Sequence, residues 1–165
     1  MSFSPIPDLC VPDIFHVTPE LLRKKGITLL CLDLDNTLSP YSEHLPPARV
    51  LAWMKELKEA GVALYMISNN KSGARAKRYA DACDMPYVAR AGKPNPKAVH
   101  EAMEQMGKTK GETALMGDQI FTDGLAANRA GVLSIVIRPI EMTALFRLRY
   151  IAEQPFRIFG REKHK

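Results

Sequence analysis

Short runs of apolar residues alternate along the chain with longer stretches in which apolar residues recur at helical spacing. The runs predict strands, and the stretches between them predict helices. Strands are expected within residues 27–32, 62–67, 86–88, 113–116 and 132–137, and helices within residues 47–60, 72–83, 95–107 and 122–130. Because strands and helices alternate, the pattern predicts a three-layer, doubly wound, Rossmann-like α/β fold with a mostly parallel five-stranded sheet.

A short helix is also expected before the first strand. Thr18 is a residue type that caps helices, Pro19 suits a first helical position, and Gly26 suits a C-terminal stop. The length of 165 residues fits a single domain with one core. That domain would consist of a lead-in over residues 1–26, the main α/β core over residues 27–138, and a basic amphipathic segment over residues 139–165.

The first apolar run leads directly into two carboxylates, Asp33 and Asp35, and then into Thr37. A run of this kind is typical of a strand that is buried on both faces. In open α/β sheets, ligands bind beyond the carboxyl ends of the strands, so chemistry is expected at these two aspartates. Asp and Asn also favour turns for conformational reasons alone, so the interpretation depends on the residues that follow later strands.

Polar groups follow the next three strands as well. They are Ser68 and Asn69 after the second strand, Lys93 after the third, and Asp118 and Asp123 after the fourth. Each residue has an ordinary explanation by itself, as a helix cap, a solvated loop lysine or an acid in the first turn of a helix. Because the carboxyl ends of parallel strands meet at one edge of the sheet, we expect all of these residues to converge.

Converging carboxylates repel one another, and a bound divalent cation relieves that repulsion. Oxygen ligands without a Cys/His cluster favour Mg²⁺, which we expect Asp33, Asp118 and the main-chain carbonyl of Asp35 to hold. Asp33 is then the expected nucleophile on phosphorus, forming an aspartyl phosphate. Asp35 is the expected general acid and base.

The remaining polar groups have expected roles around the phosphate. Thr37, Ser68, Asn69 and Lys93 are predicted to contact its oxygens, with Lys93 also lowering the pKa of the nucleophile. Asp123 is expected behind the metal ligands, where it would orient water or Lys93.

These residues resemble the four motifs of haloacid dehalogenase (HAD) superfamily phosphatases. Asp33-Leu34-Asp35-Asn36-Thr37 resembles the DxDxT/V motif, and Ser68-Asn69-Asn70, Lys93-Pro94 and Gly117–Asp123 resemble the second, third and fourth motifs. The resemblance covers residues 27–137 and implies a HAD-like fold and phosphatase activity. The Asp-Asn-Thr-Leu sequence, the GDQ-x-x-TD motif and the lead-in helix are similar to those of YqeG-type class III members. These members in turn resemble mitochondrial phosphatidylglycerophosphate phosphatases.

The spacing of the motifs leaves no room for a cap domain, the insertion with which many HAD enzymes select substrates. Residues 37–62 hold only a loop and a helix, and residues 70–93 only a helix and a short strand. We therefore expect an open site that admits a phosphate on a large molecule or a membrane surface, unless a neighbouring subunit covers it. The zinc loop of some capless members is absent, and His44 is expected at the surface or overhanging the substrate.

Charge is distributed unevenly along the chain. The net charge is +5, and the part from Arg138 onward carries seven basic residues against three acidic ones. The rest is close to neutral, so no specific nucleic-acid partner is expected. The segment 140–165 either packs as a final helix with a basic tail or contacts anionic lipid peripherally.

The sequence also gives an expectation about location. No apolar stretch is long enough to span a bilayer, and the N-terminus lacks the layout of a signal peptide. The three cysteines have no CxxC spacing. The prediction is a cytoplasmic protein, free or peripheral to a membrane.

The sequence thus predicts a Mg²⁺-dependent phosphomonoesterase, with phosphatidylglycerophosphate as the leading substrate. Soluble sugar, nucleotide or polynucleotide phosphates are alternative substrates. A receiver-like phospho-acceptor module is an alternative of another class, which Asp35 argues against because receivers have no acid two residues after the phosphorylated aspartate. A homo-oligomer remains open.

Overall fold

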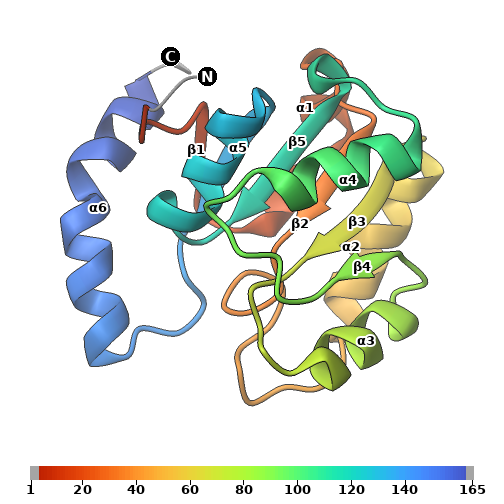
Figure 1. The fold of residues 1–165 in the computed structure, drawn as a ribbon, viewed down its shortest axis with the longest axis horizontal. Coiled ribbons are helices and arrows are strands. Elements are labelled where there is room, and N and C mark those ends of the chain that lie inside the picture. The colour runs from red at the N-terminus through yellow and green to blue at the C-terminus, as the bar shows by residue number, and fades with distance from the viewer. Residues whose placement is uncertain (1–3, 163–165) are drawn as a thin grey trace.

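The computed structural model describes residues 4–162 and contains a six-stranded, wholly parallel sheet (Figure 1). The strand order is β1-β6-β5-β2-β3-β4. The strands are β1 (Leu9–Val11), β2 (Leu29–Leu32), β3 (Ala63–Ile67), β4 (Tyr87–Val88), β5 (Thr113–Gly117) and β6 (Leu133–Ile137). β2 lies between β3 and β5, so the acidic loop that follows it is flanked by the ends of both neighbours.

The predicted count of five strands is wrong by one, because β1 adds to the edge of the sheet beside β6. This strand has three residues between two prolines, Pro7 and Pro12, so it gives no periodic signal in the sequence. Its pairing is reinforced by a side chain, since the Asp8 carboxylate accepts hydrogen bonds from the Ser134 amide and hydroxyl, each 2.9 Å long.

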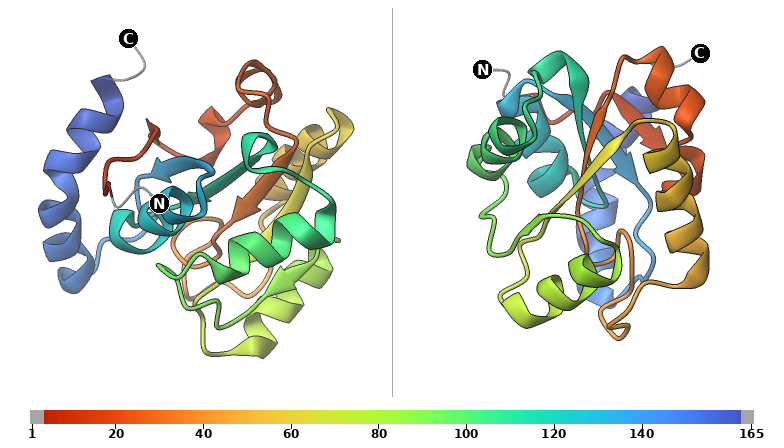
Figure 2. Two further views of the ribbon diagram at one scale, coloured as in Figure 1. Left: turned by 45° about the horizontal axis from the view of Figure 1, so that its top comes forward. Right: turned by 90° about the vertical axis from the view of Figure 1, so that its right-hand side faces the viewer.

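Helices cover both faces of the sheet (Figure 2). The helices are α1 (Pro19–Lys24), α2 (Ala48–Glu59), α3 (Gly73–Ala82), α4 (Lys97–Met106), α5 (Leu125–Ala130) and α6 (Ala144–Glu162), with 3₁₀ turns η1 (Ile14–His16) and η2 (Lys110–Glu112) and a π-helical turn η3 (Ile120–Gly124). Along β2, Leu30 and Leu32 pack with α2 and α3, whereas Leu29 and Cys31 pack with α4 and α5. This alternation confirms the predicted three-layer arrangement.

The lead-in helix is confirmed as α1. The Thr18 side chain accepts a hydrogen bond from the Leu21 amide, Pro19 is the first helical residue, and Gly26 takes a positive φ of 72° just beyond the helix. The helix expected over residues 122–130 begins differently, because the π-helical turn η3 precedes α5. Residues 37–62 and 70–93 contain no inserted cap domain, so the site is open as predicted.

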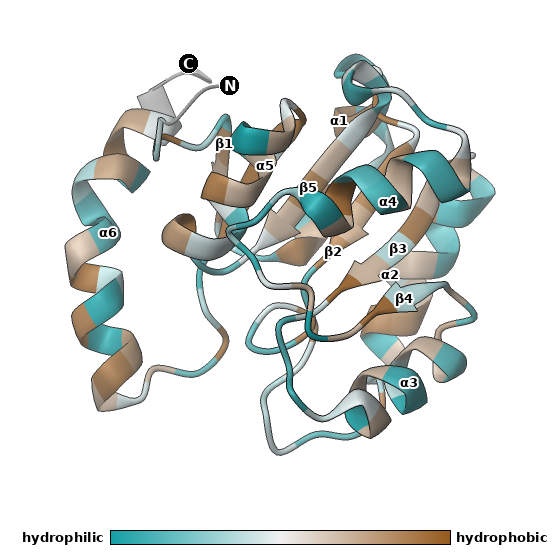
Figure 3. Cartoon of the chain, in the orientation of Figure 1, coloured by the Kyte–Doolittle hydropathy of each residue, from teal (hydrophilic) through white to brown (hydrophobic). Residues whose placement is uncertain are grey.

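The last helix, α6, runs beside β1 and turns an apolar row outward (Figures 1 and 3). The row comprises Leu145, Leu148, Ile151, Ile158 and Phe159, which are 51–69% exposed. Its inward face holds a buried Glu153–Arg157 ion pair. The usual amphipathic orientation of a surface helix is therefore reversed over much of α6. Among residues 4–162, no helix is both long and apolar enough to cross a membrane.

Candidate active site

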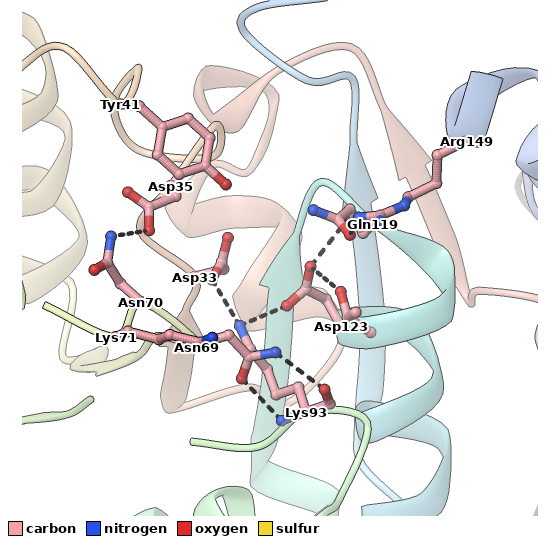
Figure 4. Close-up of a pocket in the computed structure, with 11 residues that line it drawn as sticks. Asp33, Asp35, Tyr41, Asn69, Asn70, Lys71, Lys93, Gln119, Asp123 and Arg149 are labelled. Carbon is pink, nitrogen blue, oxygen red and sulfur yellow. Dashed lines mark hydrogen bonds and ion pairs between the residues drawn. The ribbon is translucent and has the colours of Figure 1, made fainter. Parts of the chain in front are cut away.

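A pocket of about 330 Å³ opens at the carboxyl ends of the central strands (Figure 4). It is lined by Asp33, Asp35, Tyr41, Asn69, Asn70, Lys71, Lys93, Gln119, Thr122, Asp123 and Arg149. The loops that follow β2, β3, β4 and β5 all contribute to this lining, and α6 adds Arg149. The loops that follow these four strands thus meet at one edge of the sheet, as the sequence predicts.

Lys93 is the central cation of the pocket floor. Its buried ammonium lies 2.6 Å from Asp33 Oδ1 and 2.6 Å from Asp123 Oδ1, and donates a 2.7 Å hydrogen bond to the carbonyl of Ile67. The Asn69 side chain fixes the backbone of this lysine, accepting from the Lys93 amide at 2.9 Å and donating to its carbonyl at 3.0 Å. Asn69 therefore positions the lysine that contacts the first aspartate.

Three buried carboxylates form one cluster. Asp33, Asp118 and Asp123 each offer an oxygen, and these oxygens lie within 4.8 Å of one another. Asp118 Oδ2 is buried and has no hydrogen-bond partner among the described residues. Since a buried unpaired carboxylate oxygen is unfavourable, this atom fits a bound cation. The donor set of oxygens alone suits Mg²⁺.

The approach of Asp123 to this cluster requires a glycine at the end of β5. A Cβ atom built on Gly117 would lie only 2.1 Å from Cγ of Asp123. Any other residue at this position would displace the carboxylate that pairs with Lys93.

The electrostatics of the floor reflect this crowding. Burial raises the pKa of Asp33 to about 7, while Lys93 opposes the rise. Burial also raises the pKa of Asp118 well above its usual value, and the charges of Asp33 and Asp123 add to the rise. For Lys93, burial lowers the pKa, but Asp123 and Asp33 outweigh it and raise the pKa overall. Three acids thus share one ammonium, so the floor has less positive than negative charge. A bound divalent cation would correct this imbalance.

Two further side chains of the first motif, Thr37 and Asp35, have different surroundings from each other. Thr37 is buried and donates from Oγ1 to Asp33 Oδ2 at 3.0 Å. The Asp35 carboxylate lies outside the three-carboxylate cluster and accepts hydrogen bonds from Arg75 Nε at 2.9 Å and Asn70 Nδ2 at 2.6 Å. Asp35 also lines the pocket, on the side formed by Asn70 and α3.

Ser68 and His44 lie apart from the pocket lining. Ser68 is fully buried, and its Oγ accepts from the Asn70 amide at 3.0 Å. It lies directly after β3, and α3 begins only at Gly73. His44 is exposed in the loop after β2.

Sequence reasoning missed several residues of this site. Arg75 of α3 is buried and also donates to the carbonyls of Pro40 and Glu43, which ties the loop after β2 to α3. Arg149 Nη1 donates to Gln119 Oε1 at 2.6 Å, and the rings of Tyr41 and Phe146 pack with centroids 6.0 Å apart. Arg75 lies one turn before Tyr79 on the buried face of α3, but a charged side chain by itself predicts exposure, so the sequence alone did not mark it.

The fold and the site define an α/β protein with a candidate catalytic centre at the carboxyl edge of a parallel sheet, built from an aspartate–lysine pair and a carboxylate cluster. Comparison with known proteins gives the family. The sequence model of the haloacid dehalogenase-like hydrolases matches residues 13–131, and the chain belongs to this family.

Its curated relatives are named as phosphatases. The chain is 33% identical over 160 residues to "Probable phosphatase YqeG" of Bacillus subtilis, covering 97% of this chain and 92% of the relative. It is 28% identical over 149 residues to "Phosphatidylglycerophosphatase GEP4, mitochondrial" of Saccharomyces cerevisiae, covering 80% of each protein. The family and these relatives identify the chain as a phosphatase, which excludes the receiver-like alternative.

Solved structures agree on the fold. A hypothetical protein from Xanthomonas campestris, XCC2798, superposes with a TM-score of 0.58 at 23% identity, covering 93% of this chain and 80% of that one. A 3-deoxy-D-manno-octulosonate 8-phosphate phosphatase from Moraxella catarrhalis, in complex with magnesium ion, phosphate ion and KDO, superposes with a TM-score of 0.52 at 16% identity, covering 87% and 92%. At these identities the likeness concerns the fold alone.

Proposed function

We propose that this phosphatase hydrolyses phosphomonoesters through an aspartyl phosphate on Asp33 and requires Mg²⁺. The observation that carries the proposal is the buried cluster in which Asp33 contacts Lys93 at 2.6 Å, beside an oxygen of Asp118 that has no hydrogen-bond partner among residues 4–162. A carboxylate at that position has a cation beside it for the phosphoryl oxygens and lies at the floor of an open pocket.

Two proton transfers accompany the two chemical steps. In the first, a carboxylate oxygen of Asp33 bonds to phosphorus, the ester P–O bond breaks, and the leaving alcohol takes a proton from Asp35. In the second, Asp35 removes a proton from water, which attacks the aspartyl phosphate and releases inorganic phosphate. Both oxygens of Asp35 already accept hydrogen bonds, so releasing Asn70 would free Oδ2 to carry the proton that the leaving alcohol takes, while Oδ1 keeps its 2.9 Å hydrogen bond from Arg75 Nε.

The metal would be held by the carboxylates of Asp33 and Asp118 and the main-chain carbonyl of Asp35. When bound, Mg²⁺ supplies positive charge that neutralises the charge developing on the transferred phosphoryl group. Asp123 keeps Lys93 charged and directed at Asp33, while Thr37 orients the nucleophile through its 3.0 Å hydrogen bond. Ser68, directly after β3, contacts the phosphoryl oxygens in this proposal, and its Oγ also accepts from the Asn70 amide at 3.0 Å in the turn that carries Asn69 and Asn70.

Phosphatidylglycerophosphate is the proposed substrate. The relatives named as phosphatidylglycerophosphate phosphatases support this choice, although the chain matches them at only 27–28% identity. The open, capless pocket supports it as well, because it can admit a phosphate attached to a large molecule.

The exposed apolar row of α6 supports peripheral contact with an anionic membrane. Five large apolar side chains face outward on a helix whose segment carries an excess of basic residues, a combination that suits an interface with anionic lipid. Co-sedimentation with phosphatidylglycerol vesicles tests this, comparing the wild type with Leu148→Ser/Ile151→Ser. If both proteins pellet equally with the vesicles, the proposed membrane contact through α6 is wrong.

The test of the mechanism is Asp33→Asn in the full chain with Mg²⁺. We expect hydrolysis of p-nitrophenyl phosphate to fall by about 10⁴-fold or more, because the nucleophile is lost, while circular dichroism stays unchanged. Asp81→Asn, an exposed acid on α3, is the matched control and keeps wild-type activity. Retained turnover in Asp33→Asn would mean that the roles are misassigned.

The test of the substrate is a screen that compares phosphatidylglycerophosphate with soluble sugar, nucleotide and polynucleotide phosphates. The proposal predicts the highest kcat/KM for the lipid phosphate. A higher value for a soluble phosphate would establish the alternative substrate class and leave the Asp33 mechanism standing.

A further inference from the structure

Two cationic side chains stand at the mouth of the pocket and take no part in the chemistry described above. Lys71 comes from the loop after β3, and Arg149 comes from α6 (Figure 4). Both residues are exposed. Among the residues that the structure describes, neither side chain is paired with a carboxylate. Their charges are therefore available to a ligand.

Arg149 is nevertheless held in place. Its Nη1 donates to the side-chain Oε1 of Gln119 at 2.6 Å, and the main-chain N–H of Gln119 donates to Asp123 Oδ2 at 3.2 Å. Gln119 thus connects the arginine at the mouth to the loop that carries the carboxylate cluster. An arginine anchored through a neutral amide keeps its full charge and four further N–H donors for an anion.

The floor and the mouth therefore have different charge balances. The charge of Lys93 is already used by Asp33 and Asp123, whereas the charges of Lys71 and Arg149 have no acidic partner recorded within residues 4–162. The one proposed nucleophile, Asp33, reacts with one phosphoryl group at a time, so the cations at the mouth face the part of the substrate that lies beyond the scissile ester.

We propose that Arg149, together with Lys71, binds a second anionic group of the same substrate while the phosphomonoester lies against Asp33. The chemical class is a phosphomonoester that also carries a phosphodiester or a second phosphate. This inference rests on the proposed function, and it names what the site recognises beyond the phosphoryl group. Arg149 does not touch the reacting atoms, so it acts on affinity and specificity.

The test uses p-nitrophenyl phosphate hydrolysis as a reporter with full-length protein and Mg²⁺. Competitors with one anionic group (glycerol 3-phosphate) and with two (fructose 1,6-bisphosphate and short-chain dihexanoyl phosphatidylglycerophosphate) are compared by their inhibition constants. The wild type should bind the competitors with two groups more tightly. Arg149→Ala should weaken their binding by about two- to fivefold more than that of glycerol 3-phosphate, as expected for one solvent-accessible ion pair.

Two further variants separate charge recognition from structural support. Arg149→Lys should restore part of the preference, and Arg147→Ala, two residues away on the same exposed helix, should keep the wild-type preference. Raising the ionic strength should reduce the preference of the wild type, because exposed charges are screened. A structural role for Arg149 would weaken both classes of competitor equally.

The outcomes decide the two proposals separately. No preference for a second anion in the wild type, or equal losses for both classes in Arg149→Ala, overturns the subsite. A preference that depends on Arg149 for fructose 1,6-bisphosphate but not for the lipid phosphate keeps the subsite and assigns it to soluble substrates, against the proposed lipid. A preference for the lipid phosphate alone assigns the second anion to the phosphodiester.

Discussion

Two buried charge clusters meet at the loop after β5, and they differ in how their charges balance. The cluster in the pocket floor contains Asp33, Asp118, Asp123 and Lys93. The other, here called the α6 brace, is the Glu153–Arg157 pair with its backbone partners. Asp118 contributes to both clusters. Its carboxylate lies in the floor, and its main-chain carbonyl accepts a hydrogen bond from Arg157 of the α6 brace.

The α6 brace has one acid and one base. Glu153 Oε2 lies 2.9 Å from Arg157 Nη2, and Glu153 Oε1 accepts from the Ile120 amide at 2.8 Å. Arg157 Nη1 donates to the carbonyl of Ile137 at 2.8 Å, and its guanidinium lies 4.6 Å from the ring centroid of Tyr150. The brace therefore joins the end of β6 to the loop that carries Asp118.

The comparison teaches that buried charge has two uses in this fold. In the α6 brace the charges cancel and most polar groups find protein partners, so the pair fixes backbone positions. In the floor three acids share one ammonium, and an oxygen of Asp118 has no hydrogen-bond partner within the part of the chain that the structure describes, so the cluster suits a bound cation.

Removing the cation of the floor should have the largest effect, and it should appear in activity. Lys93→Met takes away the charge beside the nucleophile, so we expect kcat/KM for p-nitrophenyl phosphate to fall by about 10³-fold at saturating Mg²⁺. Lys97→Met, an exposed lysine on α4, is the control and should match the wild type. Activity within tenfold of the wild type would place Lys93 outside the chemistry.

Removing the cation of the α6 brace should appear in stability. Arg157→Met leaves Glu153 buried without its partner and two carbonyls without a donor, so the free energy of unfolding should fall by about 3 kcal/mol. Urea denaturation measures this. The double variant Glu153→Gln/Arg157→Met should recover part of the loss, because the unpaired charge is gone; no recovery would show that the pair does not act as a unit.

A metal ion should stabilise the floor and leave the α6 brace unaffected. Mg²⁺ at ten times its Kd should raise the free energy of unfolding by about 1.4 kcal/mol through binding to the folded state alone. Asp118→Asn should abolish this rise, whereas Glu153→Gln/Arg157→Met should keep much of it. Thermal melts with and without Mg²⁺ provide the comparison, and an equal rise in Asp118→Asn would place the ion elsewhere.

The smallest effect is expected on the outer face of α6, which neither cluster needs. Leu148 is 69% exposed, so Leu148→Ser should change the free energy of unfolding by about 0.5 kcal/mol or less. A loss of several kcal/mol in urea denaturation would show that the outward row packs against protein in solution.

The floor of the site could be predicted from the sequence because strand ends in a parallel sheet converge by topology. Asp33, Lys93, Asp118 and Asp123 each directly follow or closely succeed an apolar run, so their proximity follows once the runs are recognised as strands. The position of Asp123 inside the carboxylate cluster was harder to predict from the sequence, because it depends on the π-helical turn after β5.

The brace and the edge strand could not be predicted, for two physical reasons. Glu153 and Arg157 have the i, i+4 spacing of an exposed helical ion pair, and only tertiary packing buries them. The apolar row of α6 would by its pattern be turned inward, and the structure turns it outward. β1 depends on pairing with residues more than a hundred positions away, for which local sequence gives no signal.

The contact between Arg157 and the Asp118 carbonyl also has a consequence for biosynthesis. All four motifs leave the ribosome before α6 does, so a nascent chain can hold every proposed reacting group and still lack the support beneath the loop after β5. A chain that stops after β6 should therefore hold the loop after β5 less firmly than the full chain does, because the Asp118 carbonyl lacks this donor.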